Sequence, residues 1–382
     1  MPLTAFAAES ETKLAFNKDG SFKILVFADC QDDMVPRKAM IMEMEKALDE
    51  LKPDLVVFTG DNQQGLITPL MVYSAIKAII EPVKERGIPF SFTFGNHDAE
   101  TISRDLQLKM YQSFDGCVTY DAAPEIEGVG NCNLPIYASD GSDKVRFNLW
   151  MIDSNMYDDV NGGYDYVHQD QLDWYVKTGN DIAAANGGAK VPSMVFQHIP
   201  VQEIYSLLLP GEEERFGYKV KLELNKDLAQ GRLGEWPCPP NYNSGQLKTM
   251  SEQGDVLAIV TGHDHVNSFK GSCMGIDFLQ TAGIGFQTYG DELRGCRLIT
   301  LSEENPWEYE TQTYDFAHFF GTDAYARYVY LYYGSEVANI FPLLNLILDK
   351  RMKGDKAEKT LETLESIFST FDAIEETIDS WT

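Results

Sequence analysis

Polar side chains that could bind metal ions or move protons follow six apolar segments of the sequence. Each cluster stands directly after an apolar run, and in three of them a glycine precedes the polar residues. A glycine lets the backbone turn sharply, so that the next side chain can point off the end of its segment. In chain order the clusters are Asp29-Cys30-Gln31, Gly60-Asp61-Asn62, Gly95-Asn96-His97-Asp98, Asp153-Ser154-Asn155, Gln197-His198 and Gly262-His263-Asp264-His265.

These clusters combine the side chains that hold borderline divalent metals in proteins. Carboxylates, amides and imidazoles form a mixed set of oxygen and nitrogen donors that suits such ions. Single Gly-Asp or Gly-His pairs usually mark turns, and His198 taken alone could equally be a buried core histidine. The sequences GNHD and GHDH are rarer, and their occurrence with the other clusters indicates one site for two metal ions.

Several other residues in or near these clusters are predicted not to bind metal. We interpret His168 and His318 as structural or surface residues, because they lie outside the clusters. Asp153 and Asn155 are expected near the rim of the site. Cys30 stands between two candidate ligands, but side chains alternate in direction along an extended segment. We therefore expect Cys30 to pack as a small hydrophobic side chain.

The apolar runs predict the strands that would position the clusters. Fully buried parallel strands read as continuous Val, Ile and Phe runs, and the segments between the first three runs have helical spacing. The runs cover residues 22–29, 54–61, 89–98, 145–153, 192–198 and 256–265. In a mostly parallel sheet, the carboxyl ends of all strands open on the edge where α/β proteins bind ligands. Shorter runs at 273–281, 296–301 and 308–314 indicate an antiparallel continuation of a second sheet.

Two long connecting segments and a helical C-terminal region complete the predicted organisation. Residues 99–144 and 205–250 are long for connections in a compact domain, and such loops often cover a site. Residues 335–382 predict an amphipathic helical hairpin with its turn near Gly354, packed on the main body or forming a dimer interface. We divide the chain into a domain at 14–315 and a C-terminal helical extension at 316–382.

Composition excludes several classes of partner. The 382 residues include 31 Lys and Arg against 59 Asp and Glu, so the formal net charge is −28. A protein that binds nucleic acid needs a basic face, and an anionic membrane surface would repel this chain. Any anionic substrate must be attracted by local positive charge such as metal ions. We expect no nucleic-acid or membrane partner, and a homo-oligomer through the C-terminal helices remains open.

Cysteine usage and the N-terminus favour a cytoplasmic location. The six cysteines form no CxxC pair, which indicates reduced thiols rather than a disulfide framework or a zinc knuckle. The N-terminal residues MPLTAFAAESETK lack the basic and apolar regions of a signal peptide, and no glycosylation sequon occurs. A signal peptide removed before this sequence begins is the alternative.

The motif series resembles that of the calcineurin-like metallophosphoesterases. Their motifs run D-x-H, G-D, G-N-H-D, an isolated H and G-H-x-H, and this chain reads FADCQ, FTGDN, FGNHD, VFQHIP and TGHDH in the same order. The resemblance spans about residues 14–315, and KLAFNKDGSFKILVFAD with GHDHVNSF looks most like the purple-acid-phosphatase-like subgroup that lacks the tyrosine ligand. It implies an α/β fold in four αββα layers, with two mixed sheets flanked by helices.

The resemblance also implies the ligands of two divalent ions. Asp61 would bridge both ions, roughly 3.5–4 Å apart, so that they clamp the attacking and leaving oxygens of an in-line displacement. The first ion would be held by Asp29, Gln31, Asp61 and His265, and the second by Asp61, Asn96, His198 and His263. His97 would act as general acid and stabilise the phosphoryl oxygens, oriented by Asp98 or by a carboxylate from a neighbouring loop.

Two positions depart from the family pattern. Gln31 replaces a histidine and offers only an amide oxygen, so Mn²⁺ is the expected ion, with iron, Zn²⁺ and Mg²⁺ as alternatives. A glutamine here is also similar to the manganese-dependent ADP-ribose/CDP-alcohol diphosphatases. Gln64 stands where purple acid phosphatases have their tyrosine, so a coloured ferric phenolate is not expected.

The sequence therefore predicts a hydrolase that acts on a small phosphorylated substrate. A hydroxide bridging two metal ions would attack a phosphate mono- or diester in line. The first alternative is pyrophosphate cleavage in a nucleotide diphosphate derivative. The second is a catalytically silent scaffold that binds a protein through its helical tail. A scaffold predicts an eroded site, yet only Gln31 departs from the ligand pattern, and its oxygen can still bind a metal.

Overall fold

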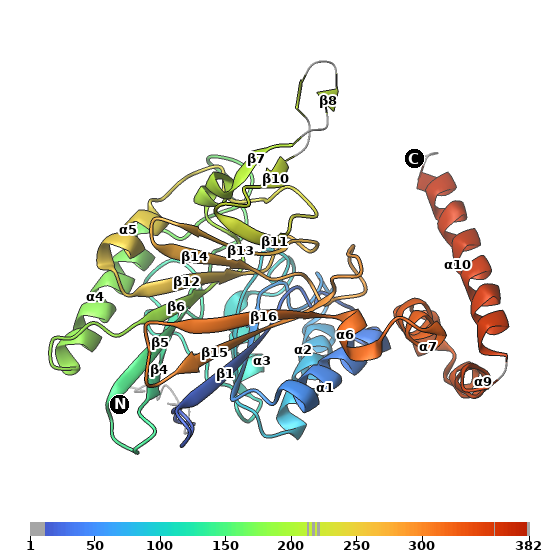
Figure 1. The fold of residues 1–382 in the computed structure, drawn as a ribbon, viewed down its shortest axis with the longest axis horizontal. Helices are drawn as coiled ribbons and strands as arrows, with labels where there is room; N and C mark the ends of the chain where they lie inside the picture. The colour runs from blue at the N-terminus through green and yellow to red at the C-terminus, as the bar shows by residue number, and fades with distance from the viewer. Residues whose placement is uncertain (1–11, 212–213, 216–217, 220–221, 355, 380–382) are drawn as a thin grey trace.

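Two mixed β-sheets packed face to face form the centre of the protein (Figure 1). The computed structural model describes residues 12–211, 214–215, 218–219, 222–354 and 356–379. The first sheet has the strand order β16-β15-β1-β2-β3, with β1, β2 and β3 parallel. Its strands are β1 (Ser21–Phe27), β2 (Leu55–Thr59), β3 (Phe90–Thr93), β15 (Gly295–Ser302) and β16 (Tyr309–Asp315).

The second sheet has the strand order β11-β13-β14-β12-β6-β5-β4. Its four central strands, β14, β12, β6 and β5, are parallel, and antiparallel strands extend it at both edges. The strands are β4 (Cys132–Tyr137), β5 (Val145–Met151), β6 (Ser193–Phe196), β11 (Ala229–Arg232), β12 (Val256–Thr261), β13 (Ser268–Cys273) and β14 (Ile276–Gln280). Two short ladders pair β7 (Leu208–Pro210) with β10 (Leu222–Leu224) and β8 (Glu214–Arg215) with β9 (Tyr218–Lys219).

The last two strands of the domain join the first sheet. The prediction that residues 296–301 and 308–314 continue the second sheet is therefore wrong, whereas the run at 273–281 contains β14, which does lie in the second sheet. Strand β15 pairs antiparallel with β1, which places Leu298 opposite Leu25. This pairing joins segments that are far apart in the chain, and local periodicity carries no information about it.

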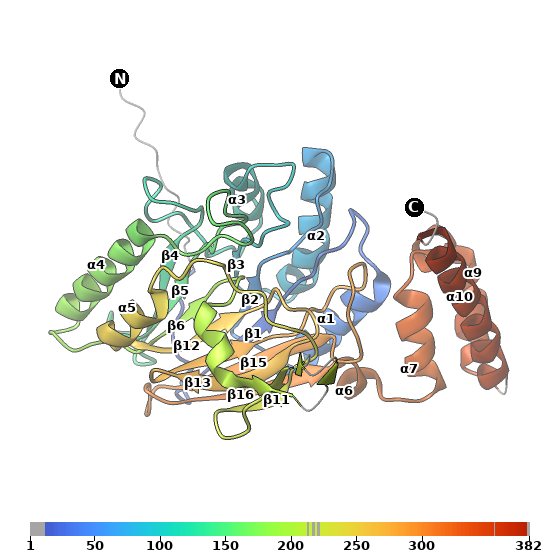
Figure 2. The ribbon, with the colours of Figure 1, turned by 90° about the horizontal axis from the view of Figure 1, so that it is seen from above.

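Helices cover the outer face of each sheet, as Figure 2 shows from above. Helices α1, α2 and α3 pack on the first sheet, and α4 and α5 pack on the second. They are α1 (Lys38–Leu51), α2 (Pro69–Glu85), α3 (Arg104–Gln112), α4 (Gln169–Ala185) and α5 (Gln246–Gln253). The predicted four-layer αββα arrangement is confirmed.

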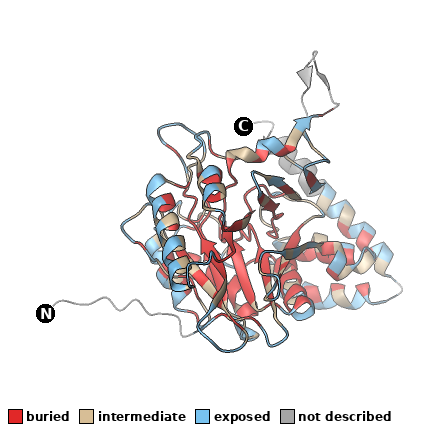
Figure 3. Ribbon diagram, turned by 60° about the vertical axis from the view of Figure 1, so that its left-hand side comes forward, coloured by how far each residue is buried: buried red, intermediate tan, exposed pale blue. Residues whose placement is uncertain are grey.

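Strand β1 shows why the central strands read as unbroken apolar runs. Its Ile24 and Val26 side chains pack between the sheets, while Leu25 and Phe27 pack under the helices. Both faces of the strand are thus covered, and all four residues are fully buried, in agreement with the buried central strands of Figure 3. The two cores fix the ends of β1, β2 and β3, and these ends carry the first polar clusters.

The predicted insertions contain regular structure of their own. Residues 99–144 include helix α3 and the edge strand β4. Residues 205–250 include the end of the 3₁₀ helix η1 (Gln202–Leu207), several short strands and most of α5. Short alternating strands at a sheet edge give weak periodicity, which explains why the sequence analysis identified these segments only as loops.

A separate helical cluster follows β16. It consists of α6 (Phe316–Phe320), α7 (Ala324–Tyr328), a π-helical turn η2 (Val329–Tyr333), α8 (Val337–Ile340), α9 (Pro342–Met352) and α10 (Ala357–Asp379). Helices α9 and α10 form the predicted hairpin around Gly354, and both lie apart from the sheets in Figures 1 and 2. Leu361 and Leu364 are buried against α7 and α9, whereas the predicted apolar positions beyond Ser369 lie outside the described side chains.

Candidate metal centre

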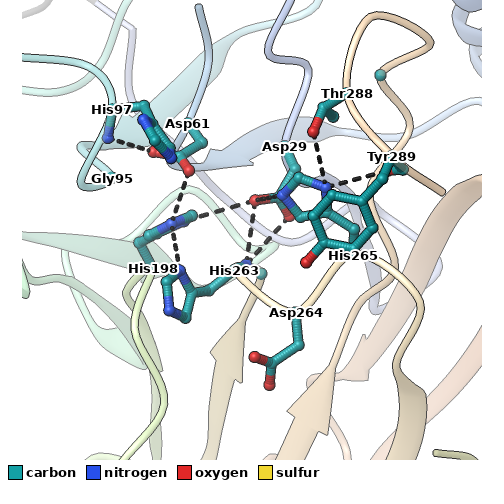
Figure 4. A network of polar contacts seen from close by, with 12 residues as sticks. Asp29, Asp61, Gly95, His97, His198, His263, Asp264, His265, Thr288 and Tyr289 are labelled. Atoms are coloured by element: carbon teal, nitrogen blue, oxygen red, sulfur yellow. Dashed lines mark hydrogen bonds and ion pairs between the residues drawn. The ribbon is translucent and has the colours of Figure 1, made fainter. Parts of the chain in front are cut away.

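The predicted ligands converge at the carboxyl ends of five strands. Each ligand follows the last residue of its strand by two to four positions, and Figure 4 shows most of them around one point. Strand β1 precedes Asp29 and Gln31, β2 precedes Asp61, β3 precedes Asn96, β6 precedes His198, and β12 precedes His263 and His265. All seven side chains are buried.

Three of these residues have a left-handed backbone. Asp29, Asp61 and His263 have φ values of 50°, 46° and 75°, a backbone region that residues other than glycine rarely adopt. Two hydrogen bonds hold the turns together, from the Asp29 N–H to the Gly60 carbonyl (3.2 Å) and from the Gln31 N–H to the Asp61 carbonyl (2.9 Å). Strained backbone of this kind clusters at functional sites. Here it turns the carboxylates and the imidazole toward one another.

The glycines of the motifs make room for the ligands. A Cβ on Gly60, whose φ is +88°, would lie 2.6 Å from Nδ1 of His198. A Cβ on Gly95 would lie 2.2 Å from Oδ1 of Asp61. Any larger residue at either position would displace a ligand, which explains the Gly-Asp and Gly-Asn-His-Asp spacing in physical terms.

One group of donor atoms surrounds Asp29. Its carboxylate, the carboxylate of Asp61 and a ring nitrogen of His265 lie within 4.8 Å of one another. Nε2 of His265 is 3.6 Å from Oδ1 of Asp29, and Nδ1 is 3.1 Å from the Tyr289 carbonyl. The carbonyl requires a proton on Nδ1, so Nε2 keeps its lone pair for a cation. Among the described residues, the buried Oε1 atom of Gln31 has no hydrogen-bond donor, as expected of an oxygen intended for a metal ion.

A second group shares Asp61 with the first. Nε2 of His198 lies 3.2 Å from each of three atoms: Oδ2 of Asp61, Oδ1 of Asn96 and Nδ1 of His263. Nδ1 of His198 donates to the Thr59 carbonyl at 2.9 Å, which turns Nε2 toward the Asp61 carboxylate and the Asn96 amide oxygen. Four potential donor atoms thus face one point, and the donor set fits a divalent cation.

Burial and mutual charge perturb the groups strongly. Burial raises the pKa of Asp29 well above its usual range, and Asp61 adds to this effect. Burial also raises the pKa of Asp61, but the charge of His198 outweighs it and places this pKa below its usual range. Burial lowers the pKa of His265 to about 4 and that of His263 well below normal, so both rings are neutral at pH 7. Burial lowers the pKa of His198, but the charges of Asp61 and Asp29 outweigh burial and raise it to about 10. The neutral rings of His263 and His265 are therefore ready for cations, whereas a cation at His198 must displace a proton.

His97 is placed at the open side of the site. Its backbone N–H donates to Oδ1 of Asp61 (2.8 Å), and its ring is partly exposed. Nδ1 of the ring lies 2.7 Å from Oε1 of Glu100. The carboxylate of Asp98 is buried and accepts from the backbone of Gly95 (2.8 Å) and Asn62 (3.0 Å). The carboxylate on the His97 ring is therefore that of Glu100, and Asp98 instead shapes the loop that carries the ligands.

The other polar residues named from the sequence lie around the site. Asp153 and Asn155 are buried and accept hydrogen bonds from Arg104 on α3, at 2.6 and 3.0 Å. Cys30 is fully buried in the core under the helices of the first sheet, as predicted. His168 precedes α4 and contacts Asp165, and His318 contacts Glu50, so neither touches the predicted ligands.

Three tyrosines surround the ligands and were not identified from the sequence. The ring of Tyr289 stacks on His265 with centroids 4.2 Å apart, and Tyr164 meets His263 edge-on at 4.3 Å. The hydroxyl of Tyr157 accepts from Nδ2 of Asn96 at 3.2 Å, which turns Oδ1 of that amide inward. These tyrosines stand in loops without motif character, so only the fold brings them to the site.

Comparisons with known proteins agree with the geometry. A family model described as calcineurin-like phosphoesterase matches residues 22–267, more than half of the chain. A protein of Arabidopsis thaliana named probable inactive purple acid phosphatase 14 is 29% identical over 312 residues, which cover 73% of this chain and 74% of the relative. The Saccharomyces cerevisiae phosphatase DCR2 is 28% identical, over 67% of this chain and 46% of the relative. A dimetal phosphatase structure from Danio rerio has a TM-score of 0.46 and 14% identity, covering 77% of this chain and 99% of that one.

Proposed function

Because the chain belongs to the calcineurin-like phosphoesterase family, we propose that it hydrolyses a phosphate mono- or diester with two divalent ions. The membership assigns the chain to the hydrolases of phosphoester bonds. The observation that carries the finer proposal is the pair of donor groups that share Asp61. In both groups a histidine is turned so that a ring nitrogen faces the carboxylates, while a backbone carbonyl binds its other nitrogen.

In this proposal seven side chains hold the ions. The first ion would be bound by Asp29, Gln31, Asp61 and His265, and the second by Asp61, Asn96, His198 and His263. When bound, the ions lower the pKa of a water molecule between them and neutralise charge on the phosphoryl oxygens. Among the described residues no lysine or arginine forms an ion pair with these ligands, so the ions would supply the positive charge that an anionic substrate needs.

His97 completes the proposed chemistry as the proton donor to the leaving oxygen. Glu100 binds Nδ1 of the ring, so Nε2 is the nitrogen that is left to face a substrate. The Asp61 carboxylate accepts from the His97 backbone, which ties the donor to the bridging ligand without using the ring. The His97 ring contacts none of the predicted ligands, so replacing it should remove the proton donor without releasing the ions.

The proposed metal is Mn²⁺, because the first donor set is rich in oxygen. Asp29, Gln31 and Asp61 would give oxygen atoms to the first ion, and His265 would give its only nitrogen. Hard, oxygen-rich sites suit Mn²⁺ and Mg²⁺, while nitrogen-rich sites suit Zn²⁺ and iron. The plant relatives are named probable inactive purple acid phosphatases, which raises the alternative of a catalytically silent scaffold. The loss of a metal-binding side chain would favour that alternative. Every position of the predicted set carries a side chain that can bind a metal.

A screen of substrates on the metal-depleted chain tests the proposal. The chain would be stripped with a chelator, then assayed with Mn²⁺ against p-nitrophenyl phosphate and bis-p-nitrophenyl phosphate. We expect hydrolysis that depends on added Mn²⁺ and disappears in the Asp61→Asn variant. Activity that survives the chelator, or the absence of activity with every phosphoester and divalent ion, would refute the proposal.

A second candidate function is supported by the tyrosines at the rim. Tyr157 and Tyr289 are 47% and 58% exposed. One face of Tyr157 stacks on Tyr164 and one face of Tyr289 on His265, so only the opposite faces could receive a base. A nucleobase stacked on such a ring gains about 1–3 kcal/mol. This favours the nucleotide diphosphate alternative, in which the chain cleaves a pyrophosphate bond. Tyr289→Leu should then reduce kcat/KM for ADP-ribose far more than for p-nitrophenyl phosphate, and equal losses would exclude stacking of the base.

We further propose that α9 pairs with α9 of a second copy. The inner residues of this helix, Leu348 and Met352, are buried, whereas its outer face is apolar and open. The exposed apolar side chains on α9 are Leu343, Leu344, Leu346 and Ile347, with Leu343 77% exposed, and Ile340 and Phe341 are exposed directly before the helix. Exposed apolar surface of this extent marks an interaction site. The net charge of −28 argues against an anionic membrane as the occupant.

The charges at the two ends of this face favour a second copy. Lys350 and Arg351 are exposed at its C-terminal end. The exposed Glu336 and the half-buried Asp33, which both form ion pairs with Arg37, lie at the other end. In an antiparallel pair with two-fold symmetry, each basic end would meet an acidic end. Analytical ultracentrifugation should show a dimer, and Leu346→Lys should give a folded monomer. A monomeric wild-type chain at tens of micromolar would refute this pairing.

A further inference from the structure

Arg294 is a buried cation that binds one loop beside the candidate metal centre. Nε donates to the Gly285 carbonyl at 2.7 Å, and Nη2 donates to the Thr288 carbonyl at 2.8 Å. Among the described residues no carboxylate lies within ion-pair distance of its guanidinium. Burying a guanidinium costs free energy unless its N–H groups find acceptors. Here the acceptors are carbonyls of the loop, so Arg294 holds the loop in one conformation.

Both ends of this loop contact predicted ligands of the first ion. The Gly285 N–H donates to the Asp29 carbonyl at 3.0 Å. At the other end, Nδ1 of His265 lies 3.1 Å from the Tyr289 carbonyl and 3.2 Å from the Thr288 hydroxyl, as drawn in Figure 4. The position of residues 285–289 thus decides where the Asp29 backbone lies and which way the His265 ring faces.

The C-terminal extension contacts the other side of the same arginine. Nη1 of Arg294 donates to the Tyr330 hydroxyl at 3.1 Å, and Tyr330 belongs to the π-helical turn η2. Phe286, a residue of the loop, packs on the Tyr330 ring with centroids 5.1 Å apart. Gly334 leaves the space for it, because a Cβ there would lie 2.6 Å from the Phe286 ring. Phe286 of the loop therefore packs against the extension, between the Tyr330 ring and the backbone of Gly334.

A second contact joins the extension to the segment that follows Gln31. Oε1 of Glu336 accepts from Nη2 of Arg37 at 2.7 Å, and Nδ2 of Asn339 donates to the Val35 and Pro36 carbonyls, both at 3.1 Å. The extension thus touches the loops on both sides of the first donor group. Within the described part of the chain, no residue of the extension forms a hydrogen bond with Asn96, His198 or His263.

From these contacts we infer that the C-terminal extension positions the ligands of the first ion but not those of the second. Tyr330 and Arg294 act as positioning residues, through the loop at 285–289, on Asp29 and His265. This inference rests on the proposed assignment of those two residues to the first ion. Partners that orient a ligand from behind typically change metal affinity by about 10- to 100-fold when they are lost.

The test compares metal affinity in three variants of the full chain. Arg294→Lys keeps the charge but replaces the planar fork, whose Nε and Nη2 bind two separate carbonyls, by a single nitrogen, and Tyr330→Phe removes a single hydroxyl. Tyr332→Phe is the matched control, because it removes a hydroxyl from the same helical turn that bonds only Asn345 within the extension. Each metal-free protein would be titrated with Mn²⁺ by calorimetry, with the melting temperature as a measure of folding.

The inference predicts a selective loss. The first site is expected to be the weaker of the two Mn²⁺ sites, because Gln31 gives it an amide oxygen in place of an imidazole nitrogen. Arg294→Lys should weaken this first site about tenfold, Tyr330→Phe should weaken it by a smaller factor, and the second site should change less than twofold. Equal weakening of both sites, unchanged binding in Arg294→Lys, or the same effect from Tyr332→Phe would overturn the inference. If the wild-type chain binds no Mn²⁺, the proposed function fails instead, so the two failures are distinguishable.

Discussion

Replacing His97 by asparagine should slow hydrolysis while leaving the metal content intact. The ring contacts Glu100 and none of the seven predicted ligands, and the contact with Asp61 is made by the backbone N–H, which asparagine retains. The variant therefore removes a proton donor from the open side of the site. General acid catalysis contributes about 10²–10⁴-fold, which corresponds to about 3–5 kcal/mol in the activation free energy.

The leaving group determines how much of this factor appears. An alkoxide is a poor leaving group and needs a proton from His97, whereas p-nitrophenolate leaves readily without one. We expect His97→Asn to lower kcat for an alkyl phosphate ester by the full factor and for the p-nitrophenyl ester by far less. Glu100→Gln should show the same dependence on the leaving group with a smaller loss, because it weakens the hold on Nδ1 and leaves the ring in place.

The assay is the ratio of kcat values for a matched pair of alkyl and p-nitrophenyl esters, measured with bound metal counted in the same samples. Loss of an ion from His97→Asn would mean that the ring is a ligand. An equal loss on both substrates would mean that His97 does not protonate the leaving oxygen. Either result would refute the role derived from its position beside Glu100.

Three other changes have outcomes that the structure specifies. Gln31→His should tighten the weaker metal site and shift its preference from Mn²⁺ toward Zn²⁺, as measured by competitive titration, because imidazole replaces the unpartnered Oε1 atom. Gly60→Ala should destabilise the fold by about 1–3 kcal/mol, because alanine is strained at the positive φ of this position. It should also release the second ion, because the new Cβ would clash with His198. Unfolding curves and bound-metal counts on the same sample would measure both effects. Glu43→Gln should stabilise the protein at pH 8 and much less at pH 4.5: burial holds the pKa of Glu43 well above its usual range, so the wild type loses stability as the pH rises above the pKa of the unfolded chain. Unfolding curves with the same pH dependence in both proteins would show that this pKa shift is absent.

The parts of the fold predicted from sequence are those fixed by local pattern. Residues 22–29 and 54–61 are covered on both faces, so their apolar runs are unbroken, and the polar residues that follow them lie at one sheet edge. The place of β15 was not predictable, because Leu298 pairs with Leu25 across most of the chain. Local periodicity is the same whichever sheet such a strand joins.

The candidate site divides in the same way. Its seven predicted ligand positions stand in short motifs that glycine conformation and strand ends explain. Glu100 lies three residues beyond His97 in a loop, and nothing in its local sequence distinguishes it from Asp98. Tyr289 stacks on His265 from a loop whose Thr288 carbonyl is bound by Arg294. Contacts that depend on loop position cannot be read from residue spacing.

Counting Mn²⁺ ions bound to the wild-type chain and to Asp61→Asn tests the central claim most directly. Asp61 is the one residue common to both donor groups, so the account predicts two ions per wild-type chain. It also predicts that the single change weakens both sites, with at most one ion retained and hydrolysis abolished. A wild-type chain that binds one ion or none, or an Asp61→Asn variant that keeps two ions, would contradict the account.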